Sequence, residues 1–308
     1  MVHEGKEAMD HPTIAVVGAS GRIGRAVIRR LGAPAVSGLD RSPGPGVGAL
    51  GRHVRGDRHD AAALAAAVDG CRVVIDTCCF DERDADALLD GLDRARGATA
   101  LPIRVVSLSS LAERPSQRWQ MAESTCGDPT ERALLAASGE PYGLGKRAAR
   151  ERLEAAMPGR VISLLLPSVL VEDDAGSRLL GYLQDSGRGG AALIAGTGRQ
   201  RLSIAPAAGV AEVIAAIVAD PIFPAGALHV APPTPVVLGS LVEALLVGAG
   251  LAPRWLRHPD PAWRGPHSGG DELVMTDRLQ SLLPALTWPD LIASARAHGA
   301  FLAARAAL

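Results

Sequence analysis

Tyrosine and lysine are scarce in this chain, and one of each stands four residues apart. The 308 residues include two tyrosines and two lysines, and Tyr142 and Lys146 share the segment PYGLGK (141–146). A chance Tyr-x-x-x-Lys spacing is expected in about 1% of sequences with this composition. A nearby ammonium favours a phenolate and lowers the tyrosine pKa from about 10 towards neutrality. Tyr142 is therefore a candidate general acid/base.

Two serines precede this pair in the chain. Ser109 and Ser110 follow the apolar segment 104–108, which has the pattern of a buried strand. The sequence predicts a helix from Lys146 to Met157, and residues i and i+4 of a helix share a face. Tyr142 and Lys146 therefore point the same way if that helix begins early enough to include both. A serine hydroxyl opposite the tyrosine would hold the reacting oxygen.

A glycine-rich turn, GASGRIG (18–24), joins the apolar segment 13–17 to a helical pattern at 25–31. Glycines at this spacing allow a tight turn, close approach of the backbone to a pyrophosphate, and close packing of helix on strand. The helix N-terminus presents N–H groups and a positive dipole end to phosphates. The order of strand, turn and helix predicts a dinucleotide-binding site.

A second predicted strand, 35–39, leads into Asp40 and Arg41. A carboxylate about 20 residues after the glycine turn can accept hydrogen bonds from the adenosine ribose hydroxyls, which favours NAD. Arg41 could pair with a 2′-phosphate instead, so NADP stays open and NAD is only slightly favoured.

Strands alternate with helices along the rest of the N-terminal half. A helix over 60–68 with Asp60 as its N-cap, a strand over 73–75 and a helix over 84–96 are expected. This rhythm predicts an α/β fold with a doubly wound parallel sheet, in which ligands bind at the carboxyl ends of the strands.

The C-terminal half continues the alternation less regularly. His229 is expected to be a packed structural histidine, and Ser240 to cap a helix. The expected elements are a strand at 161–166, a Gly- and Asp-rich segment at 173–197, helices at 209–219, 241–247 and 290–307, a strand at 228–230 and an irregular segment at 252–270.

These segments resemble, in their order and spacing, the extended short-chain dehydrogenase/reductase family (the NAD-dependent epimerase/dehydratase group). The resemblance covers about residues 12–305. Its strongest motifs are GASGRIG (18–24) and YGLGK (142–146); VVIDTCC (73–79), VVSLSS (105–110), LLLPSVLVED (164–173) and GTGRQRLSIA (196–205) support them. It implies a Rossmann domain, 12–167 plus 201–234, and a small discontinuous substrate lobe, 168–200 plus 235–308.

The resemblance also implies roles for individual residues. Ser110, Tyr142 and Lys146 would form the catalytic set. Asp40 would hold the adenosine ribose, Asp57 would contact the adenine, Cys78 and Cys79 would line the cofactor groove, Pro167 to Val169 would pass beside the nicotinamide, and Lys146 would also bond the nicotinamide ribose. The implied cofactor-binding residues are Gly18, Ser20, Gly21, Arg22, Ile23, Gly24, Asp40, Arg41, Asp57, Cys78, Cys79, Lys146, Pro167 and Val169.

The chain departs from the family pattern at three places. Leu111 and Ala112 stand where dehydratases carry an acidic pair, so elimination of water is not expected. Leu202 and Ser203 stand where an Arg-Asp pair is usual, so the arginine that grips a nucleotide diphosphate is missing unless Arg199 or Arg201 substitutes. The segment 111–140 is longer than usual, and either a substrate lid or a plain surface excursion would explain it.

Composition limits the classes of partner. A formal net charge of −1 leaves no basic face for nucleic acid, and no apolar run approaches the ~18 residues of a membrane span. The polar N-terminal segment, which we expect to be mobile, does not have the pattern of a signal peptide, and a cytoplasmic location is expected. The cysteines and histidines lack metal-ligand spacing, so no metal is expected. The family pattern implies a homodimer that acts on a small molecule.

The sequence thus predicts an NAD(P)-dependent oxidoreductase. A ketone reductase or alcohol dehydrogenase that acts on a small metabolite is favoured, because the dehydratase acids and the diphosphate-binding arginine are missing. An NAD-dependent sugar or nucleotide-sugar epimerase that works by transient oxidation is the close alternative, since it needs the same three residues. A catalytically silent NAD(P)-binding regulator is a second alternative.

Overall fold

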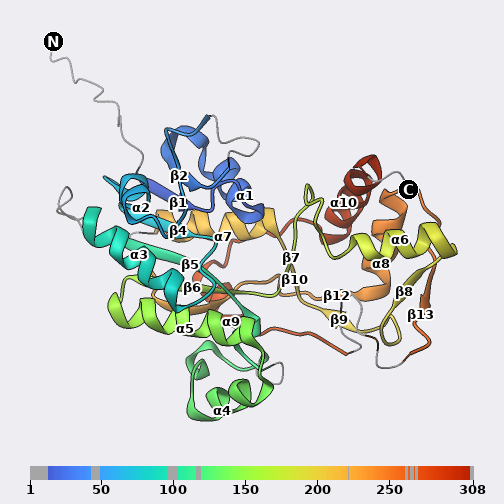
Figure 1. The fold of residues 1–308 in the computed structure, drawn as a ribbon. Coiled ribbons are helices and arrows are strands. Elements are labelled where there is room, and N and C mark those ends of the chain that lie inside the picture. Colours follow the sequence, from blue (N-terminus) through green and yellow to red (C-terminus); the bar gives the residue numbers. More distant parts are fainter. Residues whose placement is uncertain are drawn as a thin grey trace. The chain divides into compact units, whose positions relative to one another are not determined.

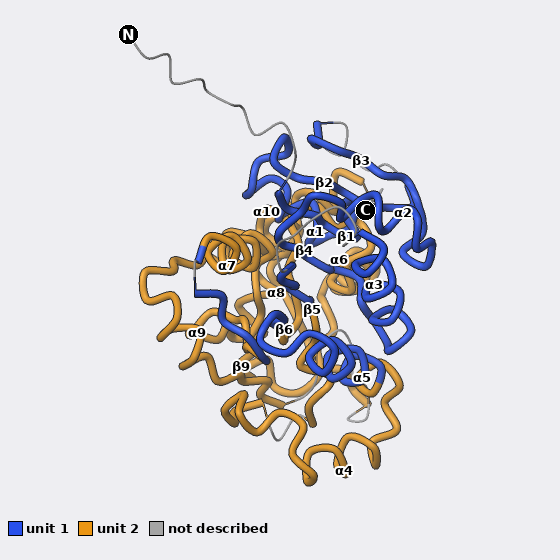
Figure 2. The backbone as a smooth tube through the Cα atoms, turned by 90° about the vertical axis from the view of Figure 1, so that its left-hand side faces the viewer, with its two compact units in different colours: residues 1–108, 145–163, 220–226 blue, residues 109–144, 164–219, 227–308 orange. Residues whose placement is uncertain are grey.

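A computed structural model describes residues 13–42, 49–95, 103–115, 119–220, 222–260, 263, 267 and 270–305. The predicted mobile tail at residues 1–12 lies outside these ranges. The chain divides into two compact units, which Figure 2 colours separately. Unit 1 comprises residues 1–108, 145–163 and 220–226, and unit 2 comprises residues 109–144, 164–219 and 227–308.

A seven-stranded sheet forms the centre of the α/β fold (Figure 1). Its strands follow the order β11-β6-β5-β4-β1-β2-β3, and the pairs from β5 to β3 are parallel. This order has the crossovers of a doubly wound sheet, which confirms the predicted fold class. The strands are β1 Ile14–Val17, β2 Val36–Asp40, β3 Arg52–Arg55, β4 Val73–Asp76, β5 Arg104–Ser110, β6 Val161–Leu166 and β11 Gly226–His229.

Unit 1 packs three helices through one buried apolar cluster. The cluster joins Leu64, Leu88 and Leu153, from α2, α3 and α5, to the β1 side chains Ala15 and Val17. Burial of this apolar surface is the main free-energy term that holds the helices against the sheet. These helices are α2 Ala61–Val68, α3 Glu82–Ala95 and α5 Pro141–Ala156, and α1 Arg22–Leu31 follows the glycine-rich segment.

Unit 2 has its own core around two crossing helices, α8 (Leu238–Gly248) and α10 (Leu291–Arg305). A Cβ at Gly248 would overlap the Arg296 carbonyl, and one at Gly299 would overlap the Leu245 carbonyl, so glycine permits this close crossing. The other elements are α4 Pro129–Ser138, α6 Leu180–Gly189, α7 Ala207–Ala219, α9 Asp277–Leu282, β7 Ser168–Leu170, β8 Ala192–Ile194, β9 Arg201–Leu202, β10 Ile204–Pro206, β12 Val236–Val237 and β13 Trp255–Arg257. The predicted division into a Rossmann domain and a lobe stays a prediction.

Several element boundaries differ from the sequence-based expectation. Helix α5 begins at Pro141, so it includes both Tyr142 and Lys146. Helix α8 begins at Leu238, so the prediction that Ser240 caps it is wrong. Strand β3 was not predicted, because its sequence RHVR carries a single apolar residue and it lies at the edge of the sheet. Strand β13 lies in the segment expected to be irregular.

Within the described ranges, no helix is long and apolar enough to cross a membrane.

Candidate active site

The glycine turn between β1 and α1 leaves no room for a side chain at Gly18 or Gly24. Gly18 has a φ of 84°, and a Cβ there would overlap Thr77 Oγ1. A Cβ at Gly24 would overlap the Gly18 carbonyl, to which the Gly21 amide donates at 3.0 Å. The turn is therefore as tight as the sequence predicts, and the backbone is exposed for close approach by a ligand.

The N-terminus of α1 suits a phosphate. The helix begins at Arg22, after Ser20 and Gly21. Gly21 is its N-cap residue, and among the described residues no side chain accepts a hydrogen bond from the first amides as a cap. The first turn contains no acidic residue. Amide groups and the positive end of the helix dipole therefore face the turn without a competing carboxylate, as pyrophosphate binding requires.

Asp40 ends β2 on the face of the sheet that carries the glycine turn. Gly38 lies two residues earlier, and a Cβ placed on it would lie 2.9 Å from the Ala19 side chain. Because alternate strand residues share a face, Asp40 points to that same side. Its Oδ2 lies 3.2 Å from His53 Nε2, and its Oδ1 is buried with no hydrogen-bond partner among the described residues. An orphaned buried acceptor fits a ribose hydroxyl.

Asp57, the predicted adenine contact, is exposed after β3. Its carboxylate accepts a hydrogen bond from the His59 amide at 2.9 Å, which holds the pKa of Asp57 below its usual range.

The next residue, Arg58, turns inward, and its role is not evident from the sequence. It forms a bidentate ion pair with Asp76 at 2.9 and 3.0 Å and lies 3.2 Å from Asp84. This buried network anchors the loop that follows β4.

Cys78 and Cys79 lie in the loop that the Arg58 network anchors. A Cβ on Gly18 would approach Cys78 Sγ to 3.2 Å, so this thiol lies beside the glycine turn. Burial raises the pKa of Cys78 to about 12 and that of Cys79 above its usual range. Both thiols are therefore uncharged at neutral pH, which suits a lining role.

Lys146 is almost completely buried in unit 1. Its Nζ donates to the carbonyl oxygens of Cys79 at 2.7 Å and Leu108 at 3.0 Å, and it lies 4.5 Å from the centre of the Phe80 ring. The ammonium thus joins the ends of β4 and β5, where ligands bind in such sheets. A Cβ on Gly145 would lie 2.8 Å from the Phe80 carbonyl, so that glycine permits the approach of α5.

Ser110 and Tyr142 belong to unit 2. Tyr142 is 49% exposed on the first turn of α5. A Cβ on the next residue, Gly143, would overlap the Ala112 carbonyl, so the start of α5 packs against the segment that follows Ser110. Ser110 Oγ accepts a hydrogen bond from the Ala112 amide at 3.2 Å. The fold therefore brings the two chain segments together, and the assignment of a catalytic set stays a prediction.

Ser109 differs from its neighbour. Its side chain is buried, and its hydroxyl donates to the buried carboxylate of Glu113 at 2.5 Å. The alternation of β5 leaves Ser110, rather than Ser109, as the candidate for contact with substrate.

The residues expected beside the nicotinamide, Pro167 and Val169, lie elsewhere in unit 2. Pro167 separates β6 from β7, and Val169 in β7 pairs with Ala205 in β10.

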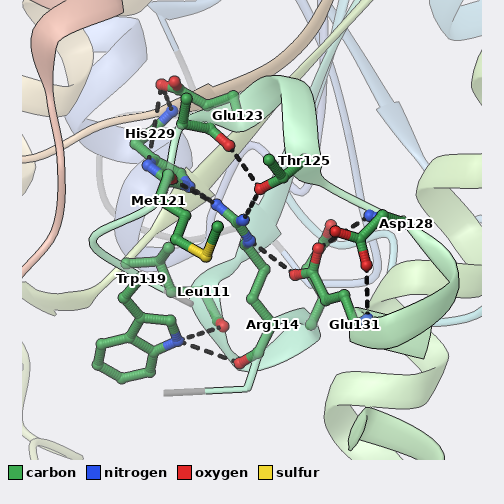
Figure 3. A network of polar contacts seen from close by, with 12 residues as sticks. Leu111, Arg114, Trp119, Met121, Glu123, Thr125, Asp128, Glu131 and His229 are labelled. Atoms are coloured by element: carbon green, nitrogen blue, oxygen red, sulfur yellow. Dashed lines mark hydrogen bonds and ion pairs between the residues drawn. The ribbon is translucent and has the colours of Figure 1, made fainter. Parts of the chain in front are cut away.

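The long segment after β5 is held by a buried arginine. Figure 3 shows Arg114 between Glu131 of α4, at 2.7 Å, and His229 of β11, at 2.8 Å. Arg114 also donates to Thr125 Oγ1 and the Met121 carbonyl, and it is 1% exposed. His229 is wholly buried, and burial lowers its pKa, so the prediction of a structural histidine is confirmed. Arg114 thereby ties α4 to β11 within unit 2.

The two arginines proposed as diphosphate ligands differ in their surroundings. Arg201 forms an exposed ion pair with Asp271, in which its Nη2 and Nε both donate to Oδ2, at 2.7 and 3.1 Å. Arg199 is exposed. Leu202, at the usual arginine position, is fully buried. Asp271 already balances the charge of Arg201, and the presence or absence of a diphosphate ligand stays a prediction.

The solved structures that are similar to this chain share one fold. No model of a protein family and no curated protein matches the chain. Solved structures do match over almost the whole of both chains. MoeE5 in complex with UDP-glucuronic acid and NAD is 19% identical, with a TM-score of 0.71 and coverage of 95% of this chain and 99% of that one.

Two further neighbours have different activities. UDP-N-acetylglucosamine 4-epimerase from Bacillus cereus is 11% identical, with a TM-score of 0.69 and coverage of 94% and 98%. Vestitone reductase from alfalfa (Medicago sativa) is 16% identical, with a TM-score of 0.65 and coverage of 95% and 98%. Together with the sheet order and the glycine turn, these likenesses show that the chain has the fold of the extended short-chain dehydrogenase/reductase enzymes.

Proposed function

We propose that this chain is an NAD-dependent enzyme that oxidises a secondary alcohol, or reduces the matching ketone, with Tyr142 as the acid/base. The orphaned Oδ1 of Asp40, on the face of the sheet that carries the tight glycine turn, carries the proposal. These features fit an adenosine ribose and a pyrophosphate, which are the two parts of a dinucleotide that this fold recognises. Gly18 to Ile23 and Asp40 would hold those parts.

The reacting residues would divide the work as follows. Tyr142 Oη removes the proton from the substrate hydroxyl or returns it to the ketone oxygen. Ser110 Oγ donates a hydrogen bond to that same oxygen. Lys146, four residues after Tyr142 on the same helix, would complete the set. A bound nicotinamide ring supplies the hydride acceptor and donor.

Epimerisation by transient oxidation is the first form of this activity that we propose. Among the neighbours, one is an epimerase of a UDP-sugar and another was solved with UDP-glucuronic acid and NAD. They favour the epimerase alternative over the one-step reductase that the sequence suggested. The same three residues would serve it, because the proton leaves and returns to the substrate oxygen, while the hydride leaves the carbon and returns to the opposite face of that same carbon.

A ketone reductase is the second candidate, and a specific observation favours it. Leu202 is buried at the position where the family's diphosphate-binding arginine is expected, and Arg201 is paired with Asp271. A substrate without a diphosphate needs neither arginine. A reductase is also among the neighbours. The two candidates differ in whether the dinucleotide is consumed.

Replacement of each of the two tyrosines tests the acid/base role. We expect Tyr142→Phe to lower kcat by about 10²- to 10⁴-fold, the usual contribution of a positioned acid/base, with NADH affinity unchanged. Tyr182→Phe is the matched control: this buried tyrosine contacts His267 at 3.3 Å, so its loss should reduce stability and leave kcat unchanged. Turnover by Tyr142→Phe at the wild-type rate would refute the role.

Product analysis separates the candidates. An epimerase given a UDP-hexose and NAD should yield the epimer, seen by NMR, with no net change in absorbance at the NADH band. A reductase should consume NADH in proportion to the ketone supplied. Dinucleotide binding without either reaction would instead support a catalytically silent regulator.

A further inference from the structure

His53 lies on the same face of the sheet as Asp40 and the glycine turn. In the parallel register of β2 and β3, Gly38 pairs with His53 and Asp40 pairs with Arg55. Paired residues share a face, and Gly38 faces Ala19 of the glycine turn. Arg52 confirms the alternation, because it points to the other face and donates to Ser37 and to carbonyl groups of α2 and its end.

The two oxygens of the Asp40 carboxylate have different environments. Oδ2 lies 3.2 Å from His53 Nε2, whereas Oδ1 is buried and has no partner among the described residues. The Asp40 side chain is 3% exposed and that of His53 is 27% exposed. A carboxylate held through one oxygen has a fixed rotamer, and its other oxygen is aimed at one place.

We propose that His53 is a specificity-determining residue that orients Asp40 towards the ribose 2′-hydroxyl and so selects NAD over NADP. The inference rests on the proposed dinucleotide site and adds the residue that sets its selectivity. Donation from His53 Nε2–H to Oδ2 leaves Oδ1 as the acceptor for the hydroxyl. A 2′-phosphate in that place would meet the negative charge of Asp40.

Two arginines make this orientation necessary. Arg55 is the register partner of Asp40, and its Nε donates to the carbonyl of Arg41 at 3.4 Å. Both arginine side chains are exposed, Arg41 follows Asp40 in the chain, Arg55 pairs with it across the strands, and a phosphate is a ligand that arginine prefers. Without His53 to hold it, the carboxylate would turn towards these cations, and the site would discriminate less between the two dinucleotides.

Binding of NADH and NADPH to wild type, His53→Ala and His53→Gln tests the proposal. Affinities are measured by calorimetry and by NADH fluorescence, so no substrate is needed. We expect wild type to prefer NADH, and His53→Ala to lower the NADH/NADPH affinity ratio by about tenfold, the effect of one hydrogen bond to a charged group. Glutamine can donate from its amide nitrogen and should restore the ratio to within about threefold of wild type.

The outcomes distinguish this inference from the proposed function. An unchanged ratio in His53→Ala, a His53→Gln ratio as low as that of alanine, or a wild-type preference for NADPH would each overturn the role of His53. Failure of the wild type to bind either dinucleotide would instead refute the proposed function. Asp40→Ala, which removes the carboxylate itself, should lose at least as much selectivity as His53→Ala. A melting temperature for each variant verifies that it is folded.

Discussion

Two neighbouring serines at the end of β5 have the same chemistry and different surroundings. Ser109 is buried and donates to the Glu113 carboxylate, whereas Ser110 points the other way and accepts only a backbone amide in the contacts described above. The difference follows from the two-residue period of a strand, which sends consecutive side chains to opposite faces. Adjacent serines thus differ, since one is held by a buried carboxylate and the other is bonded to a backbone amide.

This contrast predicts opposite outcomes for two alanine substitutions. Ser109→Ala should lower the free energy of unfolding by about 1–3 kcal/mol, because a buried carboxylate loses a donor, and should leave kcat unchanged. Ser110→Ala should lower kcat by about 10²-fold, the scale of one lost hydrogen bond to the reacting oxygen, with a smaller loss of stability. Urea denaturation and steady-state kinetics on both variants measure these quantities. A kcat loss confined to Ser109→Ala would contradict the assignment.

At the scale of elements, the loop after β4 is shaped by charges rather than by apolar packing. Arg58 joins Asp76, at the end of β4, to Asp84, in α3. Both carboxylates are nearly or wholly buried, so each depends on its partner for compensation. The loop that carries Cys78 and Cys79 is thereby held between a strand end and a helix start.

Removal of Arg58 should therefore be costly. We expect Arg58→Met to lower the free energy of unfolding by about 3–5 kcal/mol, because it leaves buried carboxylates uncompensated. Arg152→Met is the matched control, since Arg152 forms an Arg–Asp pair with Asp86 that is exposed on both sides. That control should change stability by less than about 1 kcal/mol. Equal losses in urea denaturation of the two variants would show that burial does not set the cost.

Elements with strong local signals were predictable, and those fixed by tertiary contacts were not. The glycine turn, the Asp60 cap and the pair on α5 follow from glycine spacing, capping chemistry and helix periodicity. Strand β3 has no apolar alternation, because it is an edge strand whose pairing partner supplies its order. Arg58, His53 and Arg114 were missed because a lone cation in a sequence does not reveal which carboxylate it will meet in the fold.

At the scale of the whole molecule, each unit has its own apolar core, and the core of unit 2 contains a buried tyrosine beside a buried histidine. Tyr182 and His267 stack and lie within 3.3 Å through Oη and Nδ1. Burial lowers the pKa of His267 to about 4, from 6.5 for an exposed histidine. Between pH 4 and 6.5, His267 is therefore neutral in the folded chain and protonated in the unfolded chain.

This difference predicts acid sensitivity of the folded state. Between pH 6.5 and 4 the unfolded state binds more protons than the folded state. As the pH is lowered through this range, the free energy of unfolding should decrease by up to about 1.4 kcal/mol per pH unit from this group. Above pH 6.5 its contribution is constant. His267→Asn, which keeps a polar partner for Tyr182 and cannot titrate there, should show a shallower decline. Parallel pH profiles for the two proteins would exclude His267 as the cause.

The burial of Lys146 gives the chain a natural reporter of local opening. Acylating reagents attack only a neutral, accessible amine, and Lys146 Nζ is held by two carbonyl oxygens beneath the Phe80 ring. With only two lysines in the sequence, the acylated peptide that contains position 146 is unambiguous in a mass spectrum. Its rate of formation would measure how often α5 separates from the ends of β4 and β5. A dinucleotide that binds across those strand ends should slow that reaction in proportion to its occupancy.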